Sequence, residues 1–344
     1  MIPAYLLSQL AIHDEWQRRR SLQENMSTQD YQSYRGLPSL AGLSSLEHAI
    51  QSGWSVEESA KRWKRLHFVF KRLYETLTAK ITSEPIYELK TLFSHHAYLC
   101  SEQVSSIRRR VGEMREPPLG LDKVPHPGLE RLMDEIAAAC QRFKTDAHPL
   151  ADAPSIRIAK LIEFEIDEVQ QLGEQSIACL VDSDQRTAMQ PWVDCLRQCL
   201  HVAGELDGTT TSDALVPEPI YSRTPFVYQA EPRRDERFQD SFNAGVNPEA
   251  FLYDSRFSAR DKTLMMYYKR IRELDVPEMM ASILVEIGDE EPWDFHAEMS
   301  RQLWDEARHA MMGEVGFVAQ GIDWTKIPIN FTWSRNLNTQ LDAR

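Results

Sequence analysis

The chain has 344 residues, a formal net charge of -13 and five cysteines. Hydrophobic residues make up 42% of the chain and charged residues 26%, which is typical of a globular protein and excludes disorder of the whole chain. The acidic balance argues against a broad nucleic-acid-binding surface, and we interpret the basic run at 108–110 as a solvated helix face.

Cysteine usage and hydropathy favour a cytoplasmic location. The cysteine count is odd and contains no CxxC pair, which indicates a reducing compartment rather than a disulfide framework. The first residues lack a basic segment ahead of their apolar stretch and lack a small-residue cleavage site, so we expect no signal peptide. No run of about eighteen apolar residues occurs, so we expect no membrane span.

Helical periodicity dominates the sequence and predicts an all-α fold. Ser55 and Glu58 form a capping pattern for a helix that ends near residue 81. A further helix is predicted over about 187–204. The four helices expected to form a bundle cover about 84–114, 155–182, 258–287 and 291–314.

The remaining segments complete the predicted domain organisation. Pro277 is expected to break or kink the helix over 258–287, and Gly288 to end it. The N-terminal region 1–53 and the insertion 205–254 are expected to be irregular. A loop as long as this insertion is usually a lid, a partner contact or partly disordered. We expect the whole chain to form a single domain.

The sharpest local signal is the string LWDEARHAMM, which contains Glu306 and His309. Residues three apart lie on one helix face, so this carboxylate and imidazole can bind one ion together. Glu-x-x-His is the element that di-iron and di-manganese carboxylate bundles use. Phe295, Met299 and Gln302 continue the same stripe, which places the pair on the buried face. A buried Glu is rarely tolerated unless it is paired or metal-bound.

Asp305 and Arg308 flank this pair and leave an alternative open. They can orient the Glu306 and His309 side chains through hydrogen bonds, as residues next to metal ligands often do. They can equally form a surface salt-bridge ladder with Glu306 and His309, without any metal.

The helix before the turn near residue 289 offers further carboxylates. If the two helices pack antiparallel, the positions of Glu278 and Glu306 along the helix axes differ by roughly 9 Å. Glu273 matches the level better but lies beyond the break at Pro277, and Glu286 is too near the turn. We therefore predict Glu278 as the ligand.

The first half of the chain offers a second set of candidate ligands. Glu88, His95 and Glu102 follow a seven-residue spacing on one helix face, and Glu102 is the natural single carboxylate of a first bundle helix. Glu165 and Glu168 form a Glu-x-x-Glu where bundle proteins usually have Glu-x-x-His. His95 can replace the missing imidazole. The predicted metal ligands are therefore Glu102, Glu165, Glu168, Glu278, Glu306, His309 and His95.

At these residues the sequence resembles the ferritin-like superfamily, which includes ribonucleotide reductase small subunits and arylamine oxygenases, and also resembles its uncharacterised bacterial members. The Asp-Glu-Ala-Arg-His string at 305–309 is the most specific match, and 84–182 with 258–314 cover a little under half the chain. The resemblance implies a metal-centred four-helix core and, for many members, oxygen activation. The Glu-x-x-Glu departs from that pattern and leaves open an asymmetric metal pair, a single metal or a degenerate site.

Three hypotheses follow for function. The first is an O2-dependent oxidoreductase with two iron ions, or manganese in their place, that acts on an unknown small organic substrate. The second is a ferritin-like binding or storage protein without an organic substrate. The third is a helical scaffold that has lost its metals. In each case we expect no nucleic-acid or membrane partner, and a homodimer is a reasonable assembly.

Overall fold

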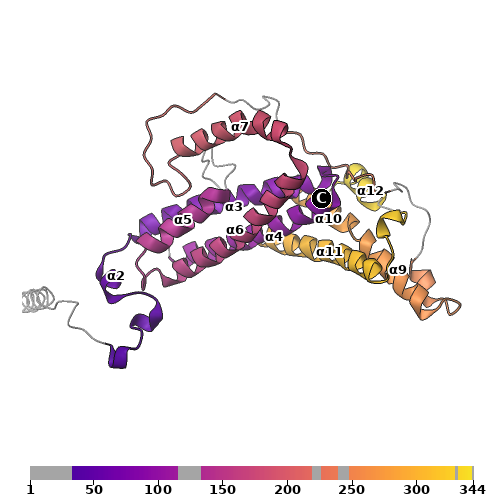
Figure 1. Ribbon diagram of the computed structural model, residues 1–344, viewed down its shortest axis with the longest axis horizontal. Coiled ribbons are helices and arrows are strands. Elements are labelled where there is room, and N and C mark those ends of the chain that lie inside the picture. Colours follow the sequence, from indigo (N-terminus) through magenta and orange to yellow (C-terminus); the bar gives the residue numbers. More distant parts are fainter. Residues whose placement is uncertain (1–32, 115–132, 219–225, 239–247, 330–331, 343–344) are drawn as a thin grey trace, which may run out of the picture.

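The computed structural model describes residues 33–114, 133–218, 226–238, 248–329 and 332–342 (Figure 1). Its regular structure in these ranges is entirely helical, which confirms the all-α prediction. The α-helices are α2 (Leu46–Ile50), α3 (Val56–Ser83), α4 (Tyr87–Glu113), α5 (Met133–Asp146), α6 (Ala153–Leu180), α7 (Ser183–Val202), α8 (Pro248–Tyr253), α9 (Ala259–Arg272), α10 (Asp275–Ile287), α11 (Trp293–Ala319) and α12 (Thr332–Gln340).

Several helix ends lie where local sequence signals predict them. The Ser55 side chain accepts a hydrogen bond from the backbone N–H of Glu58 at the start of α3. Ser258 and Asp261 form a reciprocal capping box on α9. Gly288 follows α10 with φ of 55°, a conformation that glycine adopts without strain. These caps satisfy backbone groups that a helix terminus otherwise leaves unpaired.

Four helices pack as a ring around a shared core. α3 packs against α4, α4 against α11, α11 against α10, and α10 against α3 (Figure 1). Ile81 of α3, Ala281 and Leu284 of α10 and Leu303 of α11 are buried in this core. The expected bundle contained 155–182 and not the helix after Ser55. The structure places α3 in this ring, while α6 packs against α4 and α5 and buries Ala159 and Ile162 in a separate core that it shares with α3, α4 and α5.

The expected helix over 258–287 is two helices. α9 ends at Arg272 and α10 begins at Asp275, so the break lies before Pro277 and not at it. Pro277 occupies the first turn of α10, where its missing N–H leaves no intrahelical bond unmade. Because of this break, α9 is free to follow a different line from α10, and it packs against α11.

Part of the insertion forms a strap, which we define as residues 226–238. The Thr82 hydroxyl donates to the Gln229 carbonyl (2.7 Å), and the backbone N–H of Arg233 donates to the Thr82 carbonyl (2.9 Å). The backbone N–H of Tyr87 donates to Asp235 (3.1 Å). The strap has no helix, as predicted, and it crosses the end of α3 and the start of α4. Elsewhere in the insertion, α8 is helical and departs from the prediction.

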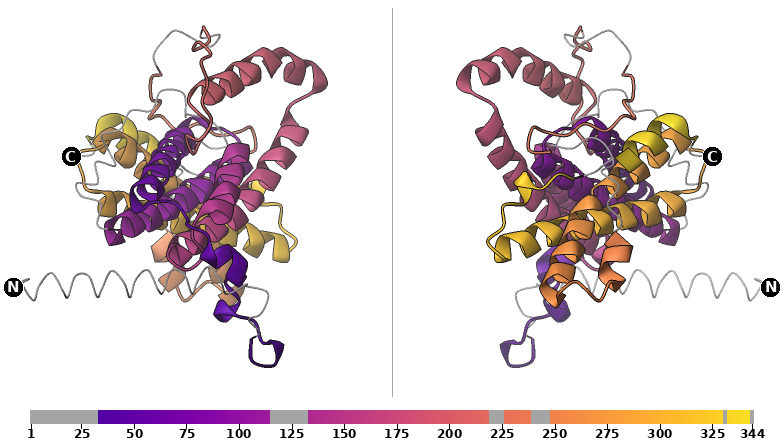
Figure 2. Two further views of the ribbon diagram at one scale, coloured as in Figure 1. Left: turned by 90° about the vertical axis from the view of Figure 1, so that its left-hand side faces the viewer. Right: turned by 90° about the vertical axis from the view of Figure 1, so that its right-hand side faces the viewer.

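Helix α7 arches away from the ring, as Figure 1 and Figure 2 show. Its C-terminal end is fixed by Arg65 of α3, whose guanidinium donates to the carbonyls of Ala203, Glu205 and Leu206. At the N-terminal side, 33–53 contains two short 3-10 turns and α2, while 1–32 lies outside the described residues. The single-domain organisation stays a prediction.

Candidate metal centre

Helix α11 presents Glu306 and His309 toward α9, and the sequence of α11 explains how close the two helices come. Gly313 and Gly316 lie seven residues after Glu306 and His309, which is about two helical turns farther along the same face. A Cβ on Gly313 would lie 2.6 Å from backbone atoms of α9, and one on Gly316 would lie 2.4 Å from the Tyr267 ring. Only glycine fits at this spacing, so α9 lies directly against the ligand-bearing face of α11.

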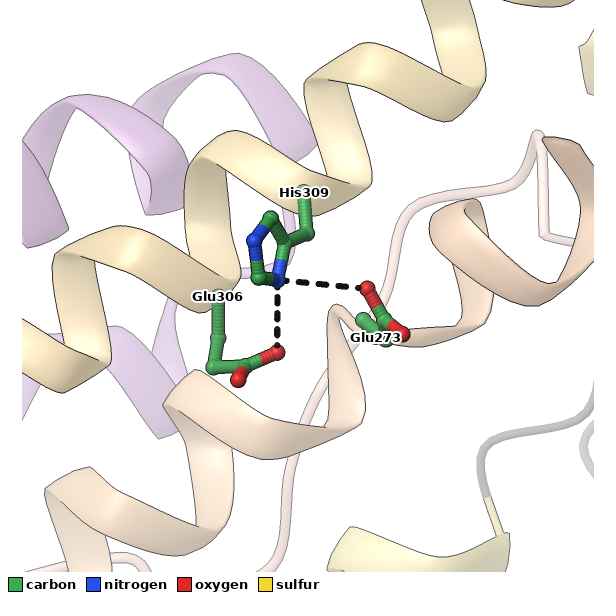
Figure 3. Close-up of side chains that lie close together, drawn as sticks. All are labelled: Glu273, Glu306 and His309. Atoms are coloured by element: carbon green, nitrogen blue, oxygen red, sulfur yellow. Dashed lines mark hydrogen bonds and ion pairs between the residues drawn. The ribbon is translucent and has the colours of Figure 1, made fainter. Parts of the chain in front are cut away.

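This contact brings a third ligand to the pair. Glu273 follows the last residue of α9 and caps it, so its position is set by where α9 stops. Its carboxylate Oε2 lies 3.4 Å from Nδ1 of His309, and the Oε2 of Glu306 lies 3.2 Å from the same nitrogen (Figure 3). One ligand atom from each residue lies within 4.8 Å of the others. We refer to these three residues, which form a candidate binding site, as the metal centre.

The metal centre is half-buried. The exposed fractions of the side chains are 18% for Glu273, 29% for Glu306 and 33% for His309. The predicted stripe is therefore only partly right. Gln302 is exposed, and the buried face of α11 instead runs through residues such as Leu303. The two ligands lie at the edge of that face, where solvent reaches them.

Charged neighbours surround the metal centre. Arg270 pairs with the Glu273 carboxylate at 2.7 Å, one turn earlier on α9. Asp305 and Arg308 form an ion pair with each other. Arg308 also lies over the Trp304 ring, 5.8 Å from its centroid. Asp305 and Arg308 therefore pair with each other across one turn of α11.

Two carboxylates and one imidazole form a ligand set suited to a divalent transition metal. Imidazole and carboxylate groups together bind ions such as Fe(II), Mn(II) and Zn(II). Three protein ligands leave coordination positions for water or a small molecule. The same geometry also suits a protonated His309 that forms ion pairs with both carboxylates, since a proton and a metal ion compete for the imidazole nitrogen.

Glu278 does not join this group, and its assignment is corrected. Its side chain is fully buried, and it forms an ion pair with Lys90 of α4. Arg234 of the strap donates to both carboxylate oxygens, at 3.0 and 2.7 Å, and the Ser334 hydroxyl donates to Oε2 at 2.6 Å. Two cations already neutralise this carboxylate. Glu273 occupies the position beside Glu306 because α9 ends next to α11, while α10 directs Glu278 toward α4.

The candidate ligands on α4 and α6 lie near one another but do not converge. Gln103 donates to the Glu165 carboxylate, and burial raises the pKa of Glu165, with a further increase from the charges of Glu102 and Glu168. His95 stacks on the Trp304 ring with centroids 4.5 Å apart, and burial lowers its pKa while Glu168 opposes the change. Within the described ranges, the metal centre is the only group of three or more such ligands.

Glu88, the last of these candidates, has another partner. Both of its carboxylate oxygens accept hydrogen bonds from Arg237 of the strap, at 2.7 and 2.6 Å. Glu88 therefore holds the strap to the start of α4.

Sequence reasoning weighed Glu273 but passed over it. The signal in its favour was its match in level to Glu306, and a second signal was the glycine pair at 313 and 316 on the ligand face. Neither signal shows that the break lies before Pro277. No local sequence pattern indicates that Glu278 pairs with Lys90 and Arg234, because these contacts join segments that are far apart in the chain.

Comparison with protein-family models, curated proteins and solved structures finds no match for this chain. The functional interpretation therefore depends on the geometry above. Among the described helices, none combines the length and the hydropathy that crossing a lipid bilayer requires.

Proposed function

We propose that this protein binds one divalent transition-metal ion through Glu273, Glu306 and His309. The observation that carries the proposal is the convergence of three different ligand side chains from α9 and α11 within 4.8 Å. The glycine pair of α11 supports it, because the close approach of α9 is built into the sequence of the ligand-bearing helix.

We expect one metal ion per chain, rather than the two ions that the sequence suggested. Glu278 is held by Lys90 and Arg234, and Glu165 is held by Gln103. Glu102, Glu165 and Glu168, the other predicted carboxylates, do not form a group of three or more ligands in the described part of the chain. We expect iron(II) or manganese(II), because carboxylate and imidazole are hard ligands compared with thiolate and therefore suit these ions.

A ferritin-like relationship forms part of the proposal. The ring of α3, α4, α10 and α11 and the Glu-x-x-His of α11 support it. Iron bound with open coordination positions supplies O2-dependent redox chemistry, so we propose an oxidoreductase as the activity to test. The residues of this chain would hold the ion between α9 and α11 and leave one side open to solvent.

A second candidate is a metal-free helical scaffold. The ion pair of Arg270 with Glu273, at 2.7 Å, favours it. Together with a protonated His309, Arg270 can balance the charge of both carboxylates without a metal.

Metal analysis distinguishes the two candidates. Protein purified without chelator is analysed for metals and then titrated anaerobically with Fe(II) and with Mn(II). We expect one ion per chain in the wild type, and its loss in Glu306→Gln and in His309→Ala. Asp305→Asn is the matched control, because it removes a carboxylate from the same turn without touching the metal centre. An absence of metal after loading would support the metal-free scaffold, whereas equal binding by all variants would show that the ion binds elsewhere and would overturn this site.

O2 consumption is measured next on iron-loaded protein. Uptake by the wild type that disappears in Glu306→Gln supports the oxidoreductase. Bound iron without any uptake, even with a reductant present, restricts the function to metal binding or storage.

A further inference from the structure

Cys195 and Cys199 lie one helical turn apart on the same face of α7. Both are free cysteines, and the Cys195 thiol lies close enough to Cys199 to contribute to the raised pKa of the Cys199 thiol. The Cys195 thiol is buried and also donates weakly to the Glu218 carbonyl, at 3.8 Å. The two sulfur atoms are therefore held next to each other by a helix and by the segment that follows α7.

The pair has access to solvent on one side. A groove of about 600 Å³ runs between α7 and the segment at 217–218, with Cys195, Gln198 and Pro217 among its lining residues. Cys195 therefore borders the groove, and Cys199, one turn farther along α7, is itself partly exposed to solvent.

The surroundings of Cys199 favour its neutral thiol. Burial raises the pKa of Cys199, and the neighbouring Cys195 thiol adds to the increase, because two adjacent thiolates repel. A cation bound between the sulfur atoms removes this repulsion.

We propose that Cys195 and Cys199 form a two-thiol binding site for a soft monovalent metal ion, Cu(I). Thiolate sulfur is the ligand that Cu(I) selects, and Cu(I) needs no more than two such ligands. Zn(II) in a structural site needs four, and within the described ranges no group of three or more ligands includes these cysteines. On binding, each thiol releases its proton to solvent and forms one Cu–S bond, with no change in oxidation state.

The site is independent of the metal centre. It uses residues of α7, whereas the metal centre uses the end of α9 and one face of α11. The ligand classes also differ, since carboxylate and imidazole groups suit harder divalent ions. Either site can therefore be lost without the other.

The test uses full-length protein, reduced and kept anaerobic, and titrated into a coloured Cu(I)–bicinchoninate complex. We expect the wild type to withdraw one Cu(I) ion per chain. Cys199→Ser and the Cys195→Ser/Cys199→Ser variant are expected to withdraw none. Cys179→Ser is the matched control, because Cys179 is exposed on α6 and is expected to leave the uptake unchanged.

Two further measurements make the result decisive. Because Cys195 is buried, circular dichroism of each variant checks the fold. If the Cys195→Ser/Cys199→Ser variant unfolds, Cys199→Ser, at a half-exposed position, carries the conclusion. Phenylarsine oxide, which crosslinks two neighbouring thiols, is expected to protect Cys195 and Cys199 together from alkylation. The proposal is overturned if the wild type withdraws no Cu(I), or if the double variant withdraws as much as the wild type.

Discussion

The Glu273 carboxylate lies 3.4 Å from the His309 imidazole, although the two residues belong to different helices. Their contact depends on the place where α9 stops and on the glycine face of α11 that lets α9 approach. The Glu-x-x-His of α11 supplies only two ligands. The third ligand, and with it a site that can hold an ion, comes from the packing of α9 on α11.

The first prediction concerns this packing. In Gly313→Ala, the new Cβ would meet the Ile271 nitrogen and the Tyr267 carbonyl oxygen at 2.6 Å, so α9 must move away. Overpacking of this kind destabilises by about 1–3 kcal/mol. Because Glu273 moves with α9, we expect metal affinity to fall by about 10- to 100-fold, which anaerobic Mn(II) titration measures.

A glycine elsewhere supplies the control for this prediction. Gly112 lies in α4 with no atom near its hypothetical Cβ. We expect Gly112→Ala to raise the free energy of unfolding by about 0.4–1 kcal/mol and to leave metal affinity unchanged. Wild-type affinity in Gly313→Ala would show that the contact between α9 and α11 does not set the site.

The second prediction concerns the buried ion pair of Lys90 and Glu278, whose side chains are 1% and 0% exposed. In Lys90→Met, the Glu278 carboxylate keeps Arg234 but loses its second cation. Breaking a buried pair by removing one partner costs about 3–5 kcal/mol. Urea denaturation measures the free energy of unfolding.

A surface pair provides the comparison for Lys90→Met. Lys71 pairs with Asp289, whose side chain is 77% exposed. Lys71→Met is expected to cost no more than about 1 kcal/mol, because exposed ion pairs contribute little. Equal costs for the two variants would contradict the structural role of the buried pair.

The third prediction concerns the pH dependence of stability. Burial raises the pKa of Asp275 to about 7, although Arg234 opposes the change, and the charge of Glu278 adds to it. Because the folded pKa lies above the ordinary value, protonation favours the folded state. This contribution is complete below about pH 4 and is lost as pH rises through about 7.

Asp275→Asn removes this titration. We expect the free energy of unfolding of Asp275→Asn, relative to the wild type, to increase as pH rises from about 4 to about 7. Denaturation curves at several pH values across this range measure the difference. A constant or falling difference for Asp275→Asn would mean that this carboxyl is ionised throughout.

The fourth prediction concerns the strap at 226–238. Asp235 accepts a hydrogen bond from the first backbone N–H of α4, where the capping residue Ile86 offers no side-chain acceptor. It also pairs with Arg237. Loss of a helix cap costs about 0.5–2 kcal/mol, so we expect Asp235→Ala to destabilise the protein by that amount and to speed proteolysis within the strap.

Glu231 serves as the control for the strap. Its side chain is 59% exposed and pairs with Arg335 at the surface. Glu231→Gln is expected to leave both stability and the rate of cleavage within the strap unchanged, as measured by timed digestion and mass spectrometry. Equal cleavage rates for Asp235→Ala and the wild type would show that other contacts hold the strap.

Much of the fold was predictable because helix signals are local. Apolar residues at three- and four-residue spacing predicted the long helices, and the caps at Ser55, Ser258 and Gly288 lie where the side chains indicated. The pairing of Glu306 with His309 was also predictable, since residues three apart share a helix face. These features depend on neighbours within one or two turns.

Which helices meet was decided by the tertiary structure. α3 and not α6 completes the ring, and Glu273 and not Glu278 joins the metal centre. Both outcomes depend on contacts between segments far apart in the chain. Glu273 lies beside His309, and Glu278 does not, because the chain breaks between α9 and α10 a few residues before Pro277. This break lets α9 diverge from the axis of α10 and pack on Gly313 and Gly316. The residues themselves specify the available ligands, but side-chain volume at helix contacts decides which of them come together.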